Sequence, residues 1–170
     1  MNAHLKPMIR FFQHLPRNGD VELTILKTHL LIEELLVTII TRAAKNPSAI
    51  EKAKLGFTQK MHLAQAFGNP AREAWLWGAL RALNKTRNKL AHGLSATEIQ
   101  QQCDSFVRLV EQSQGTPTDE IITPIFGRFH WAAFKVFSAL ASYANFDTLR
   151  RRTPTLLTGK SEPHASSDSQ

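Results

Sequence analysis

Start and stop signals for α-helices recur along the chain, and they constrain its fold more than any other feature. Asp20 is suited to cap a helix over residues 21–45, which Asn46 and Pro47 would end. Similar signals bound four further predicted helices over residues 48–67, 69–92, 95–113 and 120–145, and a short extra helix is predicted over residues 3–14. The chain is therefore predicted to be helical through most of its length.

Two of these helix starts have the sequence of a capping box, in which a serine is followed three residues later by a glutamate. The first pair is Ser48 and Glu51, and the second is Ser95 and Glu98. In a capping box each side chain bonds a backbone N–H of the first turn, so the pattern predicts where a helix begins.

The predicted fold class is all-α, an up-down bundle of about five helices, because no segment shows the period-two alternation of a strand. At 170 residues the chain fits one domain. We expect an N-terminal segment over 1–19, the helical bundle over 20–146 and a tail over 147–170. The tail is basic at first, then rich in Ser, Thr and Pro, a composition typical of disorder.

Composition narrows the function classes. A formal net charge of +7 favours a polyanionic partner, with RNA or DNA first. The single cysteine, Cys103, excludes an internal disulfide, and its neighbours in the sequence offer no base to activate it as a nucleophile. No apolar run approaches the length of a membrane span, and no signal peptide is recognisable, so we expect a cytoplasmic protein with no membrane partner.

Helical geometry places polar residues where apolar ones are expected in the predicted helix over 69–92. At about 100° per residue, Arg87 falls near the centre of an arc of leucines. Asn84, Asn88 and His92 follow one another at intervals of four residues, along the edge of that arc. The leucines of the arc are Leu76, Leu80, Leu83 and Leu90.

The predicted helix over 21–45 has the reciprocal feature, because Glu33 lies on its apolar flank. His29 is one turn away from it. An unpaired buried charge costs several kcal/mol, so Glu33 and Arg87 are expected to contact each other, directly or through one water. Such a pair could simply fix the register of two helices, with His92 as a polar helix end. Alternatively, the grouped cation, amides and imidazole could hold a phosphate and move a proton.

The segment Arg87-Asn88-Lys89-Leu90-Ala91-His92 resembles the R-x4-6-H motif of the HEPN superfamily, in its common form with Asn after Arg. In that family the motif lies at the end of a helix in a compact all-α bundle, as predicted here. The resemblance covers about residues 20–146. Many members are metal-independent ribonucleases that work as homodimers, with two motifs facing one cleft.

The resemblance implies a role for each residue of the site. Arg87 would bind the scissile phosphate or stabilise charge that develops on it. His92 would be the general base or acid for attack by the ribose 2′-hydroxyl, because imidazole exchanges protons near neutral pH. Asn88 would orient His92 or bind the phosphate, and Glu33 would position Arg87, with Asn84 in support. Lys85 and Lys89 would add positive charge for RNA, although exposed lysines are commonly only solvated.

One position departs from the pattern of some toxin members, which carry a tyrosine two residues after the motif histidine. Here that position is Leu94, so regulation through modification of that tyrosine is not implied. The resemblance still implies a toxin or defence role, with an antitoxin or regulatory protein as its partner. The alternative is a non-catalytic helical interaction or regulatory module, since other members of the family have no activity.

Other kinds of site find little support in the sequence. The seven histidines form no H-x3-H pair, and no carboxylates lie at ligand spacing, so we expect no metal and no cofactor. His62 is interpreted as an ordinary histidine on a helix face. The aromatic residues over 126–137 are interpreted as bundle core, with a dimer interface as the alternative.

Overall fold

The computed structural model describes residues 5–16, 20–67, 74–93, 95–118 and 127–152, and all regular structure among them is helical. The prediction of an all-α helical bundle is confirmed. The helices are α1 (Leu5–His14), α2 (Val21–Ala43), α3 (Pro47–Lys52), α4 (Phe57–Ala66), α5 (Ala74–Ala91), α6 (Ala96–Gln114) and α7 (Arg128–Arg152). None of these helices is both long enough and apolar enough to cross a membrane.

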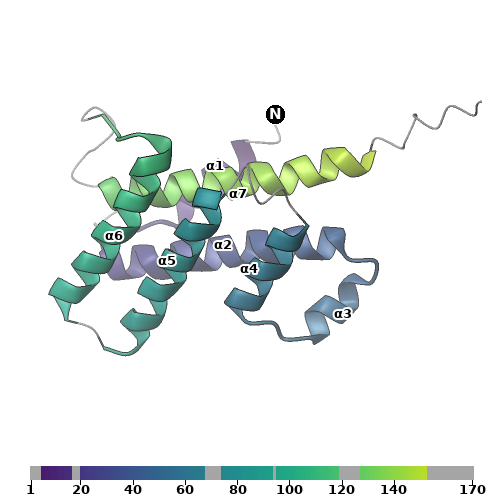
Figure 1. Cartoon of the computed structure of the whole chain (residues 1–170), viewed down its shortest axis with the longest axis horizontal. Helices are drawn as coiled ribbons and strands as arrows, with labels where there is room; N and C mark the ends of the chain where they lie inside the picture. The colour runs from purple at the N-terminus through teal and green to yellow at the C-terminus, as the bar shows by residue number, and fades with distance from the viewer. Residues whose placement is uncertain (1–4, 17–19, 68–73, 94, 119–126, 153–170) are drawn as a thin grey trace, which may run out of the picture.

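Two long helices, α2 and α7, lie side by side and form the base on which the others pack (Figure 1). Helices α5 and α6 are antiparallel neighbours, and both also contact α7. Helix α4 packs against α2 and α5, whereas α3 contacts α2 alone among the helices and lies at one end of the molecule. Helix α5 therefore contacts four other helices, α2, α4, α6 and α7.

Local capping explains two helix starts that the sequence predicted. Oδ1 of Asp20 accepts a hydrogen bond from the backbone N–H of Leu23 at 2.9 Å, as expected for an N-cap. At the start of α6, the N–H of Ser95 donates to Oε2 of Glu98 at 3.0 Å, and Oγ of Ser95 accepts from the N–H of Glu98 at 3.4 Å. The second predicted capping box is thus confirmed.

The first predicted capping box is wrong, and with it the prediction of one helix over 48–67. Oγ of Ser48 donates to Oδ1 of Asn46 at 2.7 Å and caps no helix. The backbone leaves the helical path where Lys54 adopts a left-handed conformation, with φ of 46°. A new helix, α4, starts after Gly56, whose N–H donates to Oε1 of Gln59 at 2.8 Å.

The ends of the chain differ from the predicted boundaries in extent. The predicted short helix over 3–14 corresponds to α1, and α7 continues to Arg152, past the predicted boundary at 146. Residues 68–73, 119–126 and 153–170 lie outside the described residues. The predicted start of the helix over 69–92, the start of the helix over 120–145 and most of the predicted disordered tail fall there.

The buried side of α5 is displaced from the arc of leucines that the sequence predicted. Leu76, Leu80 and Leu83 are buried as expected, but Leu90 is only half-buried. Trp77, expected near the edge of the arc, is buried and meets the ring of Tyr143 edge to face, with the ring centroids 5.7 Å apart. The buried side therefore turns toward Trp77, and Arg87 lies at its margin rather than its centre.

Candidate active site on helix α5

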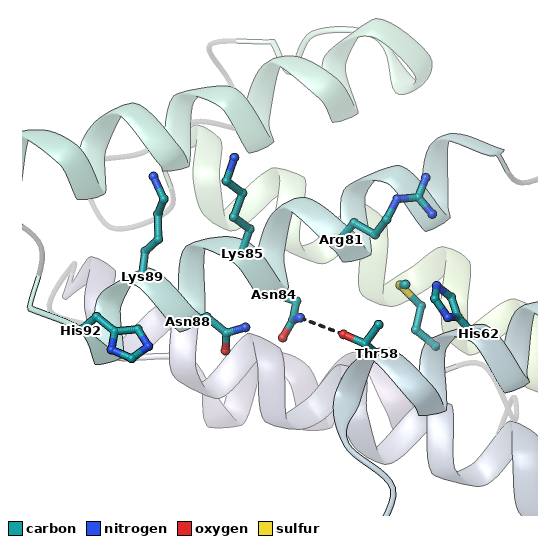
Figure 2. A pocket seen from close by; sticks show the side chains of 9 residues that line it. Thr58, His62, Arg81, Asn84, Lys85, Asn88, Lys89 and His92 are labelled. Atoms are coloured by element: carbon teal, nitrogen blue, oxygen red, sulfur yellow. Dashed lines mark hydrogen bonds between the residues drawn. The ribbon is translucent and has the colours of Figure 1, made fainter.

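The polar strip predicted along α5 lines one groove. Asn84, Asn88 and His92 all border an open groove between α4 and α5, with a volume of about 510 Å³ (Figure 2). Lys85 and Lys89, predicted as RNA-binding residues, border the same groove. The interval of four residues puts the two asparagines and His92 along one side of α5 and the two lysines along the adjacent side. The opposite wall of the groove is formed by α4.

Arg87 borders a second groove that adjoins the first. This groove has a volume of about 380 Å³ and includes Glu33 and His29 from α2. Asn84, Asn88 and Thr58 line both grooves and so form the ridge between them. The structure thus places Arg87 and His92 on either side of a shared polar ridge rather than in one hollow.

The predicted contact between Glu33 and Arg87 is not a direct ion pair, although both residues line the second groove. Glu33 instead accepts a short hydrogen bond from Lys60 on α4, with Nζ and Oε1 2.6 Å apart. The Glu33 side chain keeps 27% of its surface exposed, so it is not the deeply buried charge that required an arginine. Among the described residues, no carboxylate lies within ion-pair distance of Arg87, and its Nη1 donates to Oδ1 of Asn88 at 3.4 Å.

His29 supports the ridge from behind, a role that the sequence did not predict. Its side chain is buried, stacks on Phe57 with the ring centroids 4.2 Å apart, and Nε2 donates to Oδ1 of Asn84 at 3.0 Å. Nδ1 lies 4.0 Å from Oε2 of Glu33. Burial lowers the pKa of His29 more than the Asn84 hydrogen bond and Glu33 raise it, so the ring is favoured in its neutral form.

Asn84 is held at both ends of its amide group. Oδ1 accepts from His29, and Nδ2 donates to Oγ1 of Thr58 at 3.4 Å. Asn88 is exposed and makes its one described side-chain contact with Arg87. Of the two asparagines, Asn84 is therefore part of the scaffold and Asn88 is the one available to a ligand.

The end of α5 exposes His92 to solvent. The N–H of His92 bonds the carbonyl of Lys89 at 3.0 Å in a tight last turn, and Gly93 follows with φ of 78°. Glycine adopts this left-handed conformation without strain, so the chain can turn away directly after the histidine. The exposed imidazole at the rim of the groove agrees with the sequence-based interpretation of its position.

Four residues that line the groove were not assigned to the site from the sequence: Thr58, Met61, His62 and Arg81. Thr58 and His62 come from α4, and Arg81 lies four residues before Lys85 on α5. The spacing of Arg81 was a usable signal, because it continues the series of cations at intervals of one turn. His62 was interpreted as an ordinary helix-face histidine, and it is indeed exposed, but it faces this groove (Figure 2).

Other reactive groups lie away from the grooves. Burial, aided by the neighbouring Asp104 carboxylate, raises the pKa of the Cys103 thiol to about 11, which disfavours the nucleophilic thiolate. Within the described part of the chain, no three His, Cys, Asp or Glu side chains gather closely enough to hold a metal ion.

The chain matches no protein-family model, no curated protein and no solved structure.

Proposed function

We propose that the protein is a metal-independent endoribonuclease of the HEPN type, acting on RNA through Arg87 and His92. The observation that supports this most strongly is the state of the two charges. Glu33 is paired with Lys60, and Arg87, a half-buried residue, has no carboxylate partner among the described residues. Arg87 borders one groove, and the adjoining groove ends at the exposed His92. A guanidinium in this position favours a phosphate, whose oxygens match its planar donors.

The proposed reaction needs only groups of the RNA and the protein. His92 takes the proton from a ribose 2′-hydroxyl, and the oxygen forms a bond to the adjacent phosphorus. Arg87 stabilises the negative charge that develops on the phosphoryl oxygens. The bond from phosphorus to the 5′-oxygen breaks, a protonated imidazole supplies the proton to that oxygen, and a 2′,3′-cyclic phosphate and a 5′-hydroxyl remain.

Two imidazoles in opposite protonation states suit this reaction, because one removes a proton while the other donates one. In a homodimer with the two α5 ends facing each other, each chain would supply one of them. The proposal therefore includes a homodimer. It also includes a cytoplasmic toxin or defence role under the control of a protein partner, in line with the HEPN resemblance.

A non-catalytic interaction module is the second candidate. It is favoured by one observation, that Arg87 and His92 border adjoining grooves instead of a common one. In that case the face would bind a polyanion without cutting it.

The decisive experiment is incubation of a mixed RNA pool with the purified protein in EDTA, beside Arg87→Ala and His92→Ala. We expect RNA fragments with 5′-hydroxyl and cyclic phosphate ends. The rate should fall about 10²-fold or more in each variant. Because Glu33 has Lys60 as a partner, Arg87→Ala should change the free energy of unfolding by only about 0.5 kcal/mol.

Arg108→Ala is the matched control, because Arg108 is an exposed arginine on α6 that borders neither groove. It should cleave like the parent protein. Cleavage that both site variants retain, or that requires added Mg²⁺, contradicts the proposal. Binding without cleavage by the parent protein supports the second candidate.

A further inference from the structure

Three cations follow one another along α5 at intervals of one turn. They are Arg81, Lys85 and Lys89, and four residues of α-helix advance about 6 Å along the axis. Arg81 and Lys85 are exposed and Lys89 is half-buried. No described carboxylate forms an ion pair with any of the three, although Lys89 is close enough to Glu98 to help lower the pKa of that carboxyl. Arg81 and Lys85 therefore carry positive charge that no described ion pair balances.

The cations and the polar strip occupy different sides of the same groove. Lys85 and Lys89 extend from one side of α5, while Asn84 and Asn88 lie on the adjacent side, toward α4 (Figure 2). His92 is at one end of the groove and His62 of α4 is at the other. A linear ligand can therefore follow the groove with charge along one edge and amide groups beside it.

We propose that this groove binds a single-stranded segment of RNA beside the cleaved bond, with successive phosphates bound by Lys89, Lys85 and Arg81. The imidazole of His62 stacks on a base at the end away from His92. This inference deepens the proposed function and rests on it for the identity of the ligand as the substrate.

The arrangement favours a single strand over a duplex. In A-form RNA the base edges are paired, and the deep major groove is closed to side chains. An unpaired strand can turn its bases toward Asn88 and stack one on His62 while its backbone stays beside the cations. A row of cations alone would also attract an acidic protein segment, but such a segment has no base to stack and no sugar–phosphate repeat.

Binding is tested with His92→Ala protein, which leaves RNA intact, and a labelled single-stranded oligonucleotide at several salt concentrations. For single strands the logarithm of affinity falls with the logarithm of salt by about 0.7 per phosphate neutralised. Arg81→Gln should reduce this slope by about 0.7 and weaken binding about fivefold at about 0.1 M salt. Arg108→Gln, the same change on α6, should leave both quantities unchanged.

The role of His62 is tested by replacing the ring and by restoring one. His62→Ala should weaken binding severalfold without changing the salt slope, and His62→Phe should recover most of the loss, since base–aromatic stacking needs only a flat ring. Equal losses in His62→Ala and His62→Phe would overturn the stacking contact.

Several results would overturn the groove itself. They are an unchanged salt slope in Arg81→Gln, affinity for a duplex equal to that for a single strand, or tighter binding of poly-glutamate than of the oligonucleotide. The readout is binding by a non-cleaving variant, so failure here is separable from failure of the proposed function. If the parent protein cuts RNA but Arg81→Gln binds the oligonucleotide normally, the proposed endoribonuclease activity is supported and only the proposed path of the strand is contradicted.

Discussion

Glu33 has two cations near it, and the structure pairs it with Lys60 rather than Arg87. The pair is mostly shielded from solvent, since the side chains of Lys60 and Glu33 are only 19% and 27% exposed. A carboxylate held by Lys60 lowers the local positive charge without occupying the guanidinium of Arg87. On this view Lys60 keeps Arg87 available for a phosphate.

Removal of Lys60 is therefore expected to harm cleavage indirectly. In Lys60→Gln, Glu33 attracts the guanidinium of Arg87, and the cleavage rate should fall about fivefold, which corresponds to about 1 kcal/mol. Adding Glu33→Gln removes the competing charge and should restore most of the rate. Rates of the parent, both single variants and the double variant check this, and a double variant as slow as Lys60→Gln would contradict it.

The two asparagines of the ridge differ in what they support. Asn84→Ala leaves Nε2 of the buried His29 without its described partner, so the free energy of unfolding should fall by about 1–3 kcal/mol. Asn88→Ala, one turn along the same helix, removes an exposed side chain and should cost about 0.5 kcal/mol or less. Urea denaturation of both variants measures the difference, and equal losses would show that Asn84 is not a scaffold residue.

At the scale of single elements, the loop from α5 to α6 joins the proposed catalytic end to a well-capped helix. Ser95 and Glu98 bond each other's backbone N–H groups, so the start of α6 is fixed close to His92. Hydrogen bonds from Ser95 also lower the pKa of the Glu98 carboxyl, which keeps it ionised as an acceptor at the helix start. The cap thereby fixes the residue at which α6 begins.

Loss of this cap should be measurable as a loss of stability. Ser95→Ala is expected to reduce the free energy of unfolding by about 1 kcal/mol. The Ser95 hydroxyl accepts from the N–H of Glu98 and donates to Oε2 of Glu98, and both hydrogen bonds are lost. Ser105→Ala is the matched control, since Ser105 lies exposed in the middle of α6 and alanine is the better helix former there. Chemical denaturation followed by circular dichroism provides the measurement. Equal effects of the two substitutions would contradict a capping role.

Helix starts were predictable where the signal is local, and contacts were not. Asp20 and Ser95 cap as expected because their partners lie three residues away. The capping role predicted for Ser48 was wrong because its hydroxyl donates to the side chain of Asn46 instead. The spacing of Ser48 and Glu51 did not indicate this competing hydrogen bond. Because one helix was predicted over 48–67, the start of α4 after Gly56 was not predicted.

The same distinction applies to the candidate site. The strip of Asn84, Asn88 and His92 was predictable because helical periodicity alone aligns these side chains. The partner of Glu33 was not, because Lys60 comes from α4, whose placement follows from packing. A helix period shows which residues share a side, but it does not show which neighbouring helix faces them.

At the scale of the whole molecule, two buried histidines link stability to pH. Burial lowers the pKa of both His29 and His130, which lie under α5 and at the α2–α7 contact. In the unfolded chain each would titrate near its ordinary value of about 6.5. Below that pH the unfolded state binds more protons than the folded state, so the free energy of unfolding falls as pH falls.

The expected slope is at most about 1.4 kcal/mol per pH unit for each histidine. Urea denaturation between about pH 7.5 and 5 measures the decline. A double variant, His29→Gln with His130→Gln, should show a shallower dependence than the parent protein over the same range. An equal slope in the two proteins would mean that other groups cause the decline.

The amide of Asn84 cannot follow an incoming ligand without giving up its bonds to His29 and Thr58. A ligand that enters either groove must therefore adapt its own conformation to the fixed position of Asn84 on the ridge. We therefore expect the site to exclude ligands whose shape does not fit the ridge. The lysine side chains can adjust to a ligand, whereas Asn84 should keep one geometry in the free and the bound protein.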